Sequence, residues 1–145
     1  MNYCLKDARP ADKAFIYGTK KESLKKYIEA VWGWNERLQR DDFDRDFALL
    51  DNFKTIWLED RAVGYLETNE SGRDVNITEI HIVPEAQGKG IGSAIVSGIM
   101  RDAKEQGKRV TLGCFKANSG ALRLYQTLGF NIIGVTETHF LLAYM

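Results

Sequence analysis

The sequence predicts an α+β fold, because short runs of strand-forming residues alternate with longer segments of helical spacing. Residues 76–83 are rich in β-branched side chains, which is typical of a strand. Three glycines follow within residues 88–92, and apolar residues then recur at helical intervals over Ile91–Ala103. A chain of 145 residues is long enough for one domain with a substantial core, so we expect a single domain over residues 1–145.

The N-terminal third is predicted to be mainly helical after a first strand at residues 3–7. Arg9-Pro10-Ala11-Asp12 opens a helical region, since proline is accepted in a first helical turn. Apolar residues at helical spacing continue to Val31, and Trp32-Gly33-Trp34-Asn35 then interrupts them. Asparagine is a good helix cap, so a second helix should begin after Asn35.

The rest of the chain is predicted to be mainly sheet. A tight turn at Glu59-Asp60-Arg61 joins the first two of its strands. Gly107 is a suitable stop for a helix over residues 90–106. A short helix is expected at 119–128, and strands are expected at about 53–59, 62–68, 75–83, 109–114, 131–137 and 139–144.

Composition argues against several classes of function. Basic and acidic residues number 20 each, so no net field favours nucleic acid or a membrane surface. No apolar run approaches the length of a membrane span and no secretory signal opens the chain, which favours the cytoplasm. Cys4 and Cys114 have neither metal nor redox spacing, so we expect two buried thiols and no metal.

The glycines within residues 87–92 suit a phosphate ligand. A helix start presents unpaired N–H groups and a partial positive charge, and glycine lets the backbone approach an anion closely. Dinucleotide-binding folds and P-loops need other spacings. Read as Gln-x-x-Gly-x-Gly, with Gln87, Gly90 and Gly92, the stretch resembles the pyrophosphate loop of the GCN5-related N-acetyltransferases, which bind acetyl-CoA. A flexible turn before an ordinary helix is the alternative.

Residues 118–130 resemble a second motif of the same family, N-x-x-A-x-x-x-Y-x-x-x-G-F. One helical face carries Ala121, Leu122, Tyr125 and Leu128. Gly129 lies where a left-handed C-terminal cap is expected. The resemblance covers nearly the whole chain and is sharp over 79–92 and 118–130. It implies a mixed, mostly antiparallel sheet of six to seven strands, flanked by about four helices.

The resemblance also implies a donor site for acetyl-CoA. Backbone N–H groups of the glycine loop would bind the pyrophosphate, and the strand end would hydrogen-bond the pantetheine arm. Asn118 would contact the CoA arm, with a plain helix cap as the compatible alternative. The predicted donor-binding residues are Ile82, Val83, Gln87, Gly88, Lys89, Gly90, Ile91, Gly92, Ser93, Asn118 and Tyr125.

Acetyl transfer requires the amine to lose a proton and the CoA thiolate to gain one. By resemblance, Tyr125 lies beside the sulfur and is the candidate acid, with a packing tyrosine as the alternative. Glu79 matches the place of a base in many relatives and shares one side of its strand with His81. His81, His139 and solvent remain the other candidates, since histidine titrates nearer neutral pH.

The segment Trp32-Gly33-Trp34-Asn35-Glu36 resembles a bacterial subset of the family. The two tryptophans could stack on an aromatic acceptor or hold an ammonium group, and Glu36 adds negative charge. Hydrophobic anchoring of the turn between two helices is the alternative. The predicted acceptor-binding residues are Trp32, Trp34, Glu36, His81 and His139.

We therefore expect a cytoplasmic N-acetyltransferase that moves an acetyl group from acetyl-CoA to a primary amine. The amine would attack directly, through a tetrahedral intermediate. A small-molecule amine is the favoured acceptor, and a peptide, as in protein N-terminal or lysine acetyltransferases, is the alternative. A non-catalytic acyl-CoA sensor is the second alternative. Neither nucleic acid nor membrane is expected as a partner, and a homodimer is left open.

Overall fold

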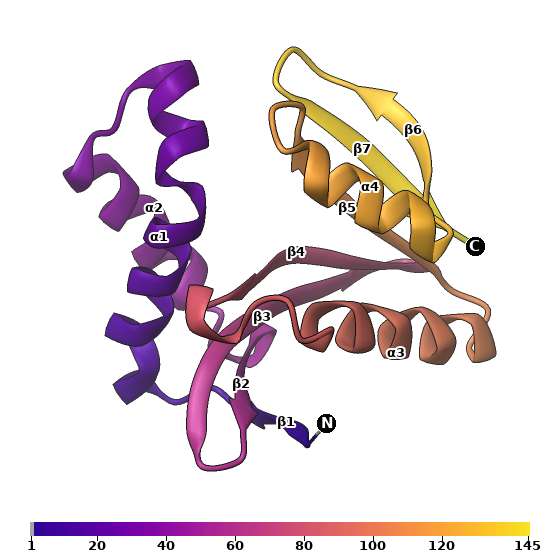
Figure 1. Cartoon of the computed structure of the whole chain (residues 1–145), viewed down its shortest axis with the longest axis horizontal. Helices are drawn as coiled ribbons and strands as arrows, with labels where there is room; N and C mark the ends of the chain where they lie inside the picture. Colours follow the sequence, from indigo (N-terminus) through magenta and orange to yellow (C-terminus); the bar gives the residue numbers. More distant parts are fainter. Residues whose placement is uncertain (1) are drawn as a thin grey trace. The chain divides into compact units, whose positions relative to one another are not determined.

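The computed structural model describes residues 2–145, which divide into two compact units (Figure 1). The first unit runs to Glu67 and resumes over Glu79–Lys89. The second contains Thr68–Thr78 and Gly90–Met145. Strands β3 (Arg61–Ser71) and β4 (Asp74–Ile82) belong to both units, because the tip of their hairpin lies in the second.

The strands pair in the order β1-β2-β3-β4-β5-β7-β6. β1 (Tyr3–Asp7) is antiparallel to β2 (Phe53–Leu58), and β2 is antiparallel to β3. β4 is parallel to β5 (Arg109–Phe115), whereas β7 (His139–Tyr144) is antiparallel to both β5 and β6 (Asn131–Val135). Over residues 2–145, a mixed, mostly antiparallel sheet of seven strands with four α-helices confirms the predicted fold class.

Helices α1 (Lys13–Trp32) and α2 (Glu36–Phe47) provide much of the core of the first unit. The Phe43 ring lies 5.3 Å from that of Tyr17 and 5.4 Å from that of Phe47, measured between ring centroids. Burying each such side chain contributes roughly 1.5–3 kcal/mol. The buried cluster comprises Ala8, Ile16, Tyr17, Phe43, Phe47, Phe53 and Tyr65.

The break between α1 and α2 follows from two local signals. Gly33 has φ of +76°, a conformation that favours glycine. The Asn35 side-chain oxygen accepts a hydrogen bond of 3.0 Å from the Leu38 N–H and so caps α2. Both the interruption and the cap confirm the prediction.

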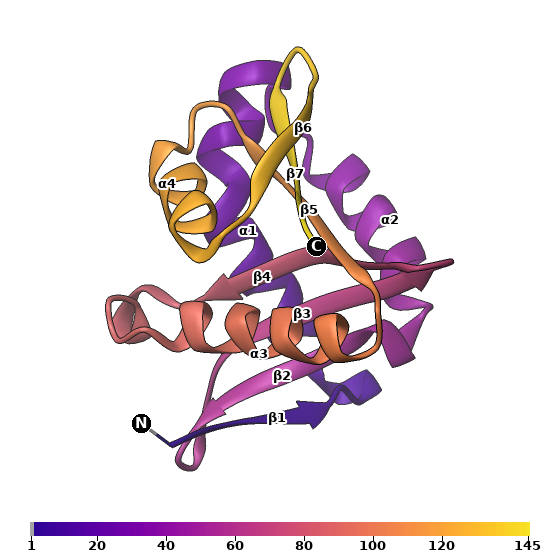
Figure 2. The same ribbon diagram turned by 90° about the vertical axis from the view of Figure 1, so that its right-hand side faces the viewer.

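Helix α3 (Ile91–Glu105) follows the glycine loop and packs against β5 in the second unit (Figure 2). Its buried face carries Ile91, Ile95, Val96, Met100 and Ala103. The helix ends two residues before Gly107, whose φ is +69°. The predicted helix over residues 90–106 is therefore confirmed to within one residue at each end.

Helix α4 (Ser119–Leu128) has the predicted bounds and the predicted caps. The Asn118 side-chain oxygen accepts a 3.1 Å hydrogen bond from the Ala121 N–H. Gly129 closes the helix at φ of +115°, and Phe130, which is 2% exposed, folds back beside Tyr125. The half-buried face consists of Ala121, Leu122, Tyr125 and Leu128.

The prediction of two buried thiols is wrong for Cys4, which is exposed, and holds for Cys114, which is buried. β1 is an edge strand of the sheet, and every residue from Cys4 to Asp7 is exposed. Both cysteines are unbridged. In the part of the chain that the structure describes, no helix is both long and apolar enough to span a membrane.

Candidate functional site

The loop between β4 and α3 contains the predicted donor-binding motif. Pro84–Ala86 forms a single 3-10 turn, in which Ala86 is buried. The Gln87 side-chain nitrogen donates a 2.8 Å hydrogen bond to the carbonyl oxygen of Ile82. This bond fastens the loop to the end of the strand, so Gln87 has a defined structural role in addition to its predicted one.

The glycines of this loop give the start of α3 an open backbone. Gly88 and Gly90 have φ of +77° and +79°, which other residues rarely adopt. Gly90 is the N-terminal cap of α3 and offers no side-chain acceptor to the N–H groups of the first turn. A Cβ atom added at Gly92 would meet no atom within 4 Å. The helix start can therefore receive an anion such as a pyrophosphate.

The end of β4 is held closely against β3. The Val83 N–H donates a 2.8 Å hydrogen bond to the Val63 carbonyl oxygen. A Cβ at Gly64 would collide with the His81 carbonyl oxygen, so glycine is required there for the strands to approach. Of the two residues predicted to bind the pantetheine arm, Val83 thus already uses its N–H in the sheet.

Tyr125 and His139, two predicted site residues, lie in the second unit. The Tyr125 side chain is half-buried on α4, and its ring lies edge-on to Phe130 with centroids 5.8 Å apart. His139 opens β7, where its ring is 4.1 Å from the Phe115 ring and its Nδ1 is 2.7 Å from the Thr138 hydroxyl. Both side chains have defined orientations within that unit.

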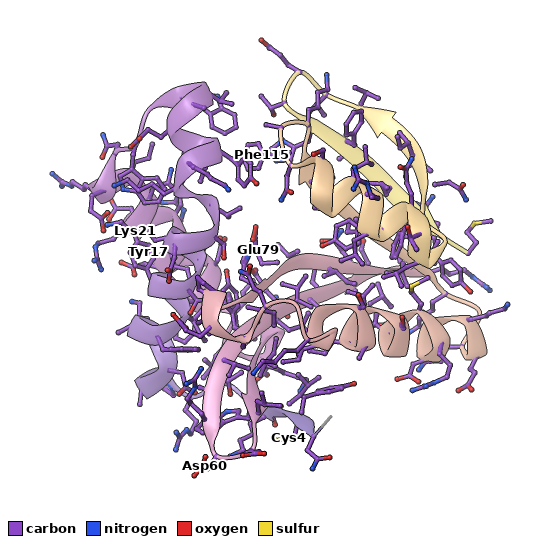
Figure 3. All side chains as sticks on the ribbon, viewed as in Figure 1. Cys4, Tyr17, Lys21, Asp60, Glu79 and Phe115 are labelled. Carbon is purple, nitrogen blue, oxygen red and sulfur yellow. The ribbon has the colours of Figure 1, made fainter. Side chains whose placement is uncertain are left out.

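Glu79 and His81 come together on β4 in the first unit, as their alternation predicts (Figure 3 labels Glu79). A short hydrogen bond joins Glu79 Oε2 to His81 Nε2. The Glu79 side chain is 21% exposed and that of His81 is 14% exposed. Across on β3, the Tyr65 ring lies 5.5 Å from the imidazole of His81.

Glu67 belongs to the same group and was not predicted from the sequence. It follows the buried run Val63–Leu66 on β3 and is only 7% exposed. Burial raises the pKa of Glu67 to about 7; Lys20 opposes this rise, and the charges of Glu79 and Asp46 add to it. One feature of the sequence could have identified Glu67: it is a glutamate that directly follows the apolar residues of a predicted strand.

The Tyr65 hydroxyl is buried without a hydrogen-bond partner, the sole side-chain polar atom in that state within residues 2–145. Burial raises its pKa well above the usual value, and the charges of Glu79, Glu67 and Asp46 raise it further. The hydroxyl therefore lies in the field of all three carboxylates, and it could donate a hydrogen bond that it does not make here.

Trp34 and Glu36 form a bonded cluster at the junction of α1 and α2, near Tyr17 and Lys21, which Figure 3 labels. Glu36 accepts hydrogen bonds from Lys21 (2.8 Å), Trp34 (2.9 Å), Tyr17 (3.0 Å) and Arg40 (2.6 Å). These donors, Lys21 first and Trp34 next, lower the pKa of Glu36 to about 2. Trp32, by contrast, is 63% exposed.

The profile of the acetyltransferase (GNAT) family matches residues 19–130. An uncharacterised N-acetyltransferase of Methanocaldococcus jannaschii is 30% identical over 114 residues, which cover 78% of this chain and 50% of the relative. The spermine/spermidine N(1)-acetyltransferase of Bacillus subtilis is 36% identical over 72 residues, covering 48% of this chain and 47% of the relative. The chain thus spans about half the length of these curated relatives.

Among solved structures, the PaiA N-acetyltransferase of Thermoplasma acidophilum in complex with coenzyme A has a similar fold. The TM-score is 0.77, and the match covers 99% of this chain and 98% of that one at 16% sequence identity. This similarity confirms the acetyltransferase fold that the two sequence motifs implied.

Proposed function

Because the chain belongs to the acetyltransferase (GNAT) family, we propose that it transfers the acetyl group of acetyl-CoA to a small primary amine. The open backbone at the start of α3 carries this proposal, because it offers N–H groups to a pyrophosphate without a side chain in front of them. The spermine/spermidine acetyltransferase among the relatives supports an amine as acceptor.

In the proposed donor site, the backbone from Gln87 to Gly92 binds the pyrophosphate, and the Ser93 hydroxyl adds a donor. Asn118 contacts the CoA arm while its side-chain oxygen caps α4. Since the Val83 N–H already bonds Val63, we propose that the N–H of Ile82 meets the pantetheine arm or the thioester carbonyl. Acetyl-CoA itself supplies the activated thioester.

The proposed reaction begins with removal of a proton from the acceptor ammonium by Glu79, whose side chain is the more exposed of the Glu79–His81 pair. The neutral amine attacks the thioester carbonyl and forms a tetrahedral oxyanion. The C–S bond then breaks, and the Tyr125 hydroxyl protonates the CoA thiolate. His81 orients the Glu79 carboxylate through their hydrogen bond.

Trp32, Trp34 and Glu36 are proposed to contribute to acceptor binding with two different tasks, and His81 and His139 stay further candidates. Exposed Trp32 offers an aromatic surface, whereas Trp34 and Glu36 hold the turn that presents it. The similarity of this segment to a bacterial subset of the family stays a prediction. So do the cytoplasmic location and a homodimer.

The first prediction tests donor binding with Gly92→Leu. Leucine fills the open space at the helix start while keeping the helix, because Gly92 has no positive φ. Acetyl-CoA affinity measured by calorimetry is expected to fall by about tenfold or more, which is roughly 1.4 kcal/mol.

Gly98→Leu is the matched control for this experiment. It makes the same substitution in the same helix, and a Cβ there meets only an Arg101 side-chain nitrogen at 3.8 Å. This variant should bind acetyl-CoA as the wild type does. A folded Gly92→Leu protein with wild-type affinity would remove the loop from the donor site.

A further inference from the structure

Glu67 is a buried acid for which the proposed reaction has no task. Within residues 2–145 its carboxyl group forms neither a hydrogen bond nor an ion pair; the residue is 7% exposed, and its oxygens, unlike the Tyr65 hydroxyl, keep some contact with solvent. A carboxylate that is mostly withdrawn from water and has no partner is unfavourable in its charged form. Its presence points to a function that needs the acid.

Two contacts between β3 and β4 enclose Glu67 and Glu79. On one side, the rings of Tyr65 and His81 lie 5.5 Å apart. On the other, the Asn69 side chain donates a 3.0 Å hydrogen bond to the Thr78 hydroxyl. Along β3, Glu67 lies between Tyr65 and Asn69. Along β4, Glu79 lies between Thr78 and His81. The two acids are thus neighbours on adjacent strands.

Charges on three other elements act on Glu67: Lys20 on α1, Asp46 on α2 and Glu79 on β4. Tyr65 lies two residues away on the same side of β3, and its buried hydroxyl has no partner and senses the charges of all three acids.

The chemistry of the acceptor explains why a second carboxyl group would help to remove its proton. An alkyl ammonium has a pKa near 10, so an ordinary carboxylate holds its proton only briefly and readily returns it. Burial raises the pKa of Glu67 to about 7, which makes it a better proton acceptor near neutral pH. A proton moved onward from Glu79 is no longer available to reprotonate the amine.

We propose that Glu67 is a positioning residue of the acetyl-transfer reaction, which takes up the proton that Glu79 removes from the acceptor ammonium. This inference rests on the proposed function and deepens it. Glu79 contacts the acceptor, and Glu67 acts through Glu79 from the neighbouring strand β3.

One N–H bond of the ammonium breaks and an O–H bond forms on Glu79, while the electron pair stays on nitrogen. The proton then passes to a carboxylate oxygen of Glu67, which restores the Glu79 carboxylate. The Tyr125 proton goes to the thiolate, and the second N–H proton of the tetrahedral intermediate restores Tyr125. Glu67 finally releases its proton to water, so one acetylamine, one CoA thiol and one proton are formed.

The kinetic test uses Glu67→Gln, which has the shape and neutrality of protonated glutamic acid but cannot accept a proton. With acetyl-CoA and a panel of spermine, spermidine and butylamine, kcat at about pH 7 should fall by about tenfold or more. The wild type should show a rise of kcat through about pH 7 that the variant lacks. Acceptor KM and acetyl-CoA affinity should stay unchanged.

Glu70→Gln is the matched control, because Glu70 lies on the same strand but is exposed and paired with Lys108. Its pH profile should equal that of the wild type. A second readout needs no activity: infrared difference spectra of the wild type should show one carboxyl group that loses its proton at about pH 7, and Glu67→Gln should lack it.

The outcomes separate the two proposals. A folded Glu67→Gln protein with wild-type kcat and pH profile would overturn the role of Glu67 and leave acetyl transfer standing. The absence of an infrared titration near neutral pH in the wild type would do the same. A wild-type protein that binds acetyl-CoA but acetylates no amine of the panel would overturn both proposals.

Discussion

Glu36 and Glu67 lie in the same compact unit, but their surroundings are opposite. Glu36 is half-buried and accepts hydrogen bonds from four side chains, which lower its pKa to about 2. Glu67 is almost fully buried and has no donor, and its pKa is raised to about 7. Hydrogen bonds favour the charged form of one acid, whereas desolvation favours the protonated form of the other.

This difference separates an acid that holds the structure together from one that can change its charge near neutral pH. The donors to Glu36 come from α1, from the turn after it and from α2, so its charge joins three segments. A permanently ionised group of this kind is suited to structural work. Glu67 is suited to exchange a proton, because both of its forms are populated near neutral pH.

The largest expected effect concerns Glu79. Its carboxylate has one hydrogen-bond partner, His81, and is therefore intermediate between Glu36, which has four, and Glu67, which has none. Glu79→Gln should lower kcat at neutral pH by roughly 10²–10⁴-fold, because the general base is lost at nearly constant shape. Activity should recover as the pH rises and neutral amine accumulates. The pH dependence of kcat, measured by CoA thiol release, checks this prediction. A wild-type profile would transfer the role to His139, His81 or solvent.

The next effect is on stability: Glu67 and Glu36 should change the free energy of unfolding with pH in opposite directions. The pKa of Glu67 in the folded protein is raised above its unfolded value of 4.5. Its contribution to the free energy of unfolding is therefore complete below pH 4.5 and is lost as the pH rises through about 7. Glu67→Gln should therefore be more stable than the wild type above about pH 8, by at most about 3 kcal/mol. Urea denaturation at several pH values measures the difference.

Glu36 provides the opposite arm of the same experiment. Its pKa is lowered, so its contribution is present above about pH 4.5 and is lost as the pH falls towards about 2. Glu36→Gln should be less stable than the wild type at neutral pH, and the difference should shrink on acidification. Salt should weaken this effect, because the cluster is partly exposed. Equal pH slopes for both variants would contradict the comparison.

The smallest effect is expected for Tyr65→Phe. The ring keeps its packing against Phe53, whose centroid is 6.2 Å away, and only the buried hydroxyl without a partner is removed. The free energy of unfolding should stay the same or rise by up to about 1 kcal/mol. A clear loss of stability would mean that the hydroxyl makes a stabilising bond in solution.

The sequence was sufficient for features that depend on neighbouring residues. The caps of α2 and α4 and the positive φ at Gly129 follow from residues within one helical turn of each other. The strand, glycine loop and helix around Gly90 are equally local. The two motifs in this part of the chain also identified the family, which the family profile confirms.

Features that depend on distant segments could not be predicted in this way. Glu67 is buried because α1 and α2 cover its side of β3, and nothing beside it in the sequence reports that cover. Cys4 is exposed because β1 is at the sheet edge, which depends on the strand order. The roles of Tyr125, Glu79 and the glycine loop in acetyl transfer stay predictions that the variants above can test.

The contrast between the two cysteines has a practical consequence for assays. Exposed Cys4 should react at once with a chromogenic disulfide reagent, so each enzyme molecule adds one thiol of background to a continuous measurement of CoA release. Burial raises the pKa of the Cys114 thiol and slows its reaction. Once Cys4 is replaced by serine, the slow modification of Cys114 would report how often the second unit opens, independently of any substrate.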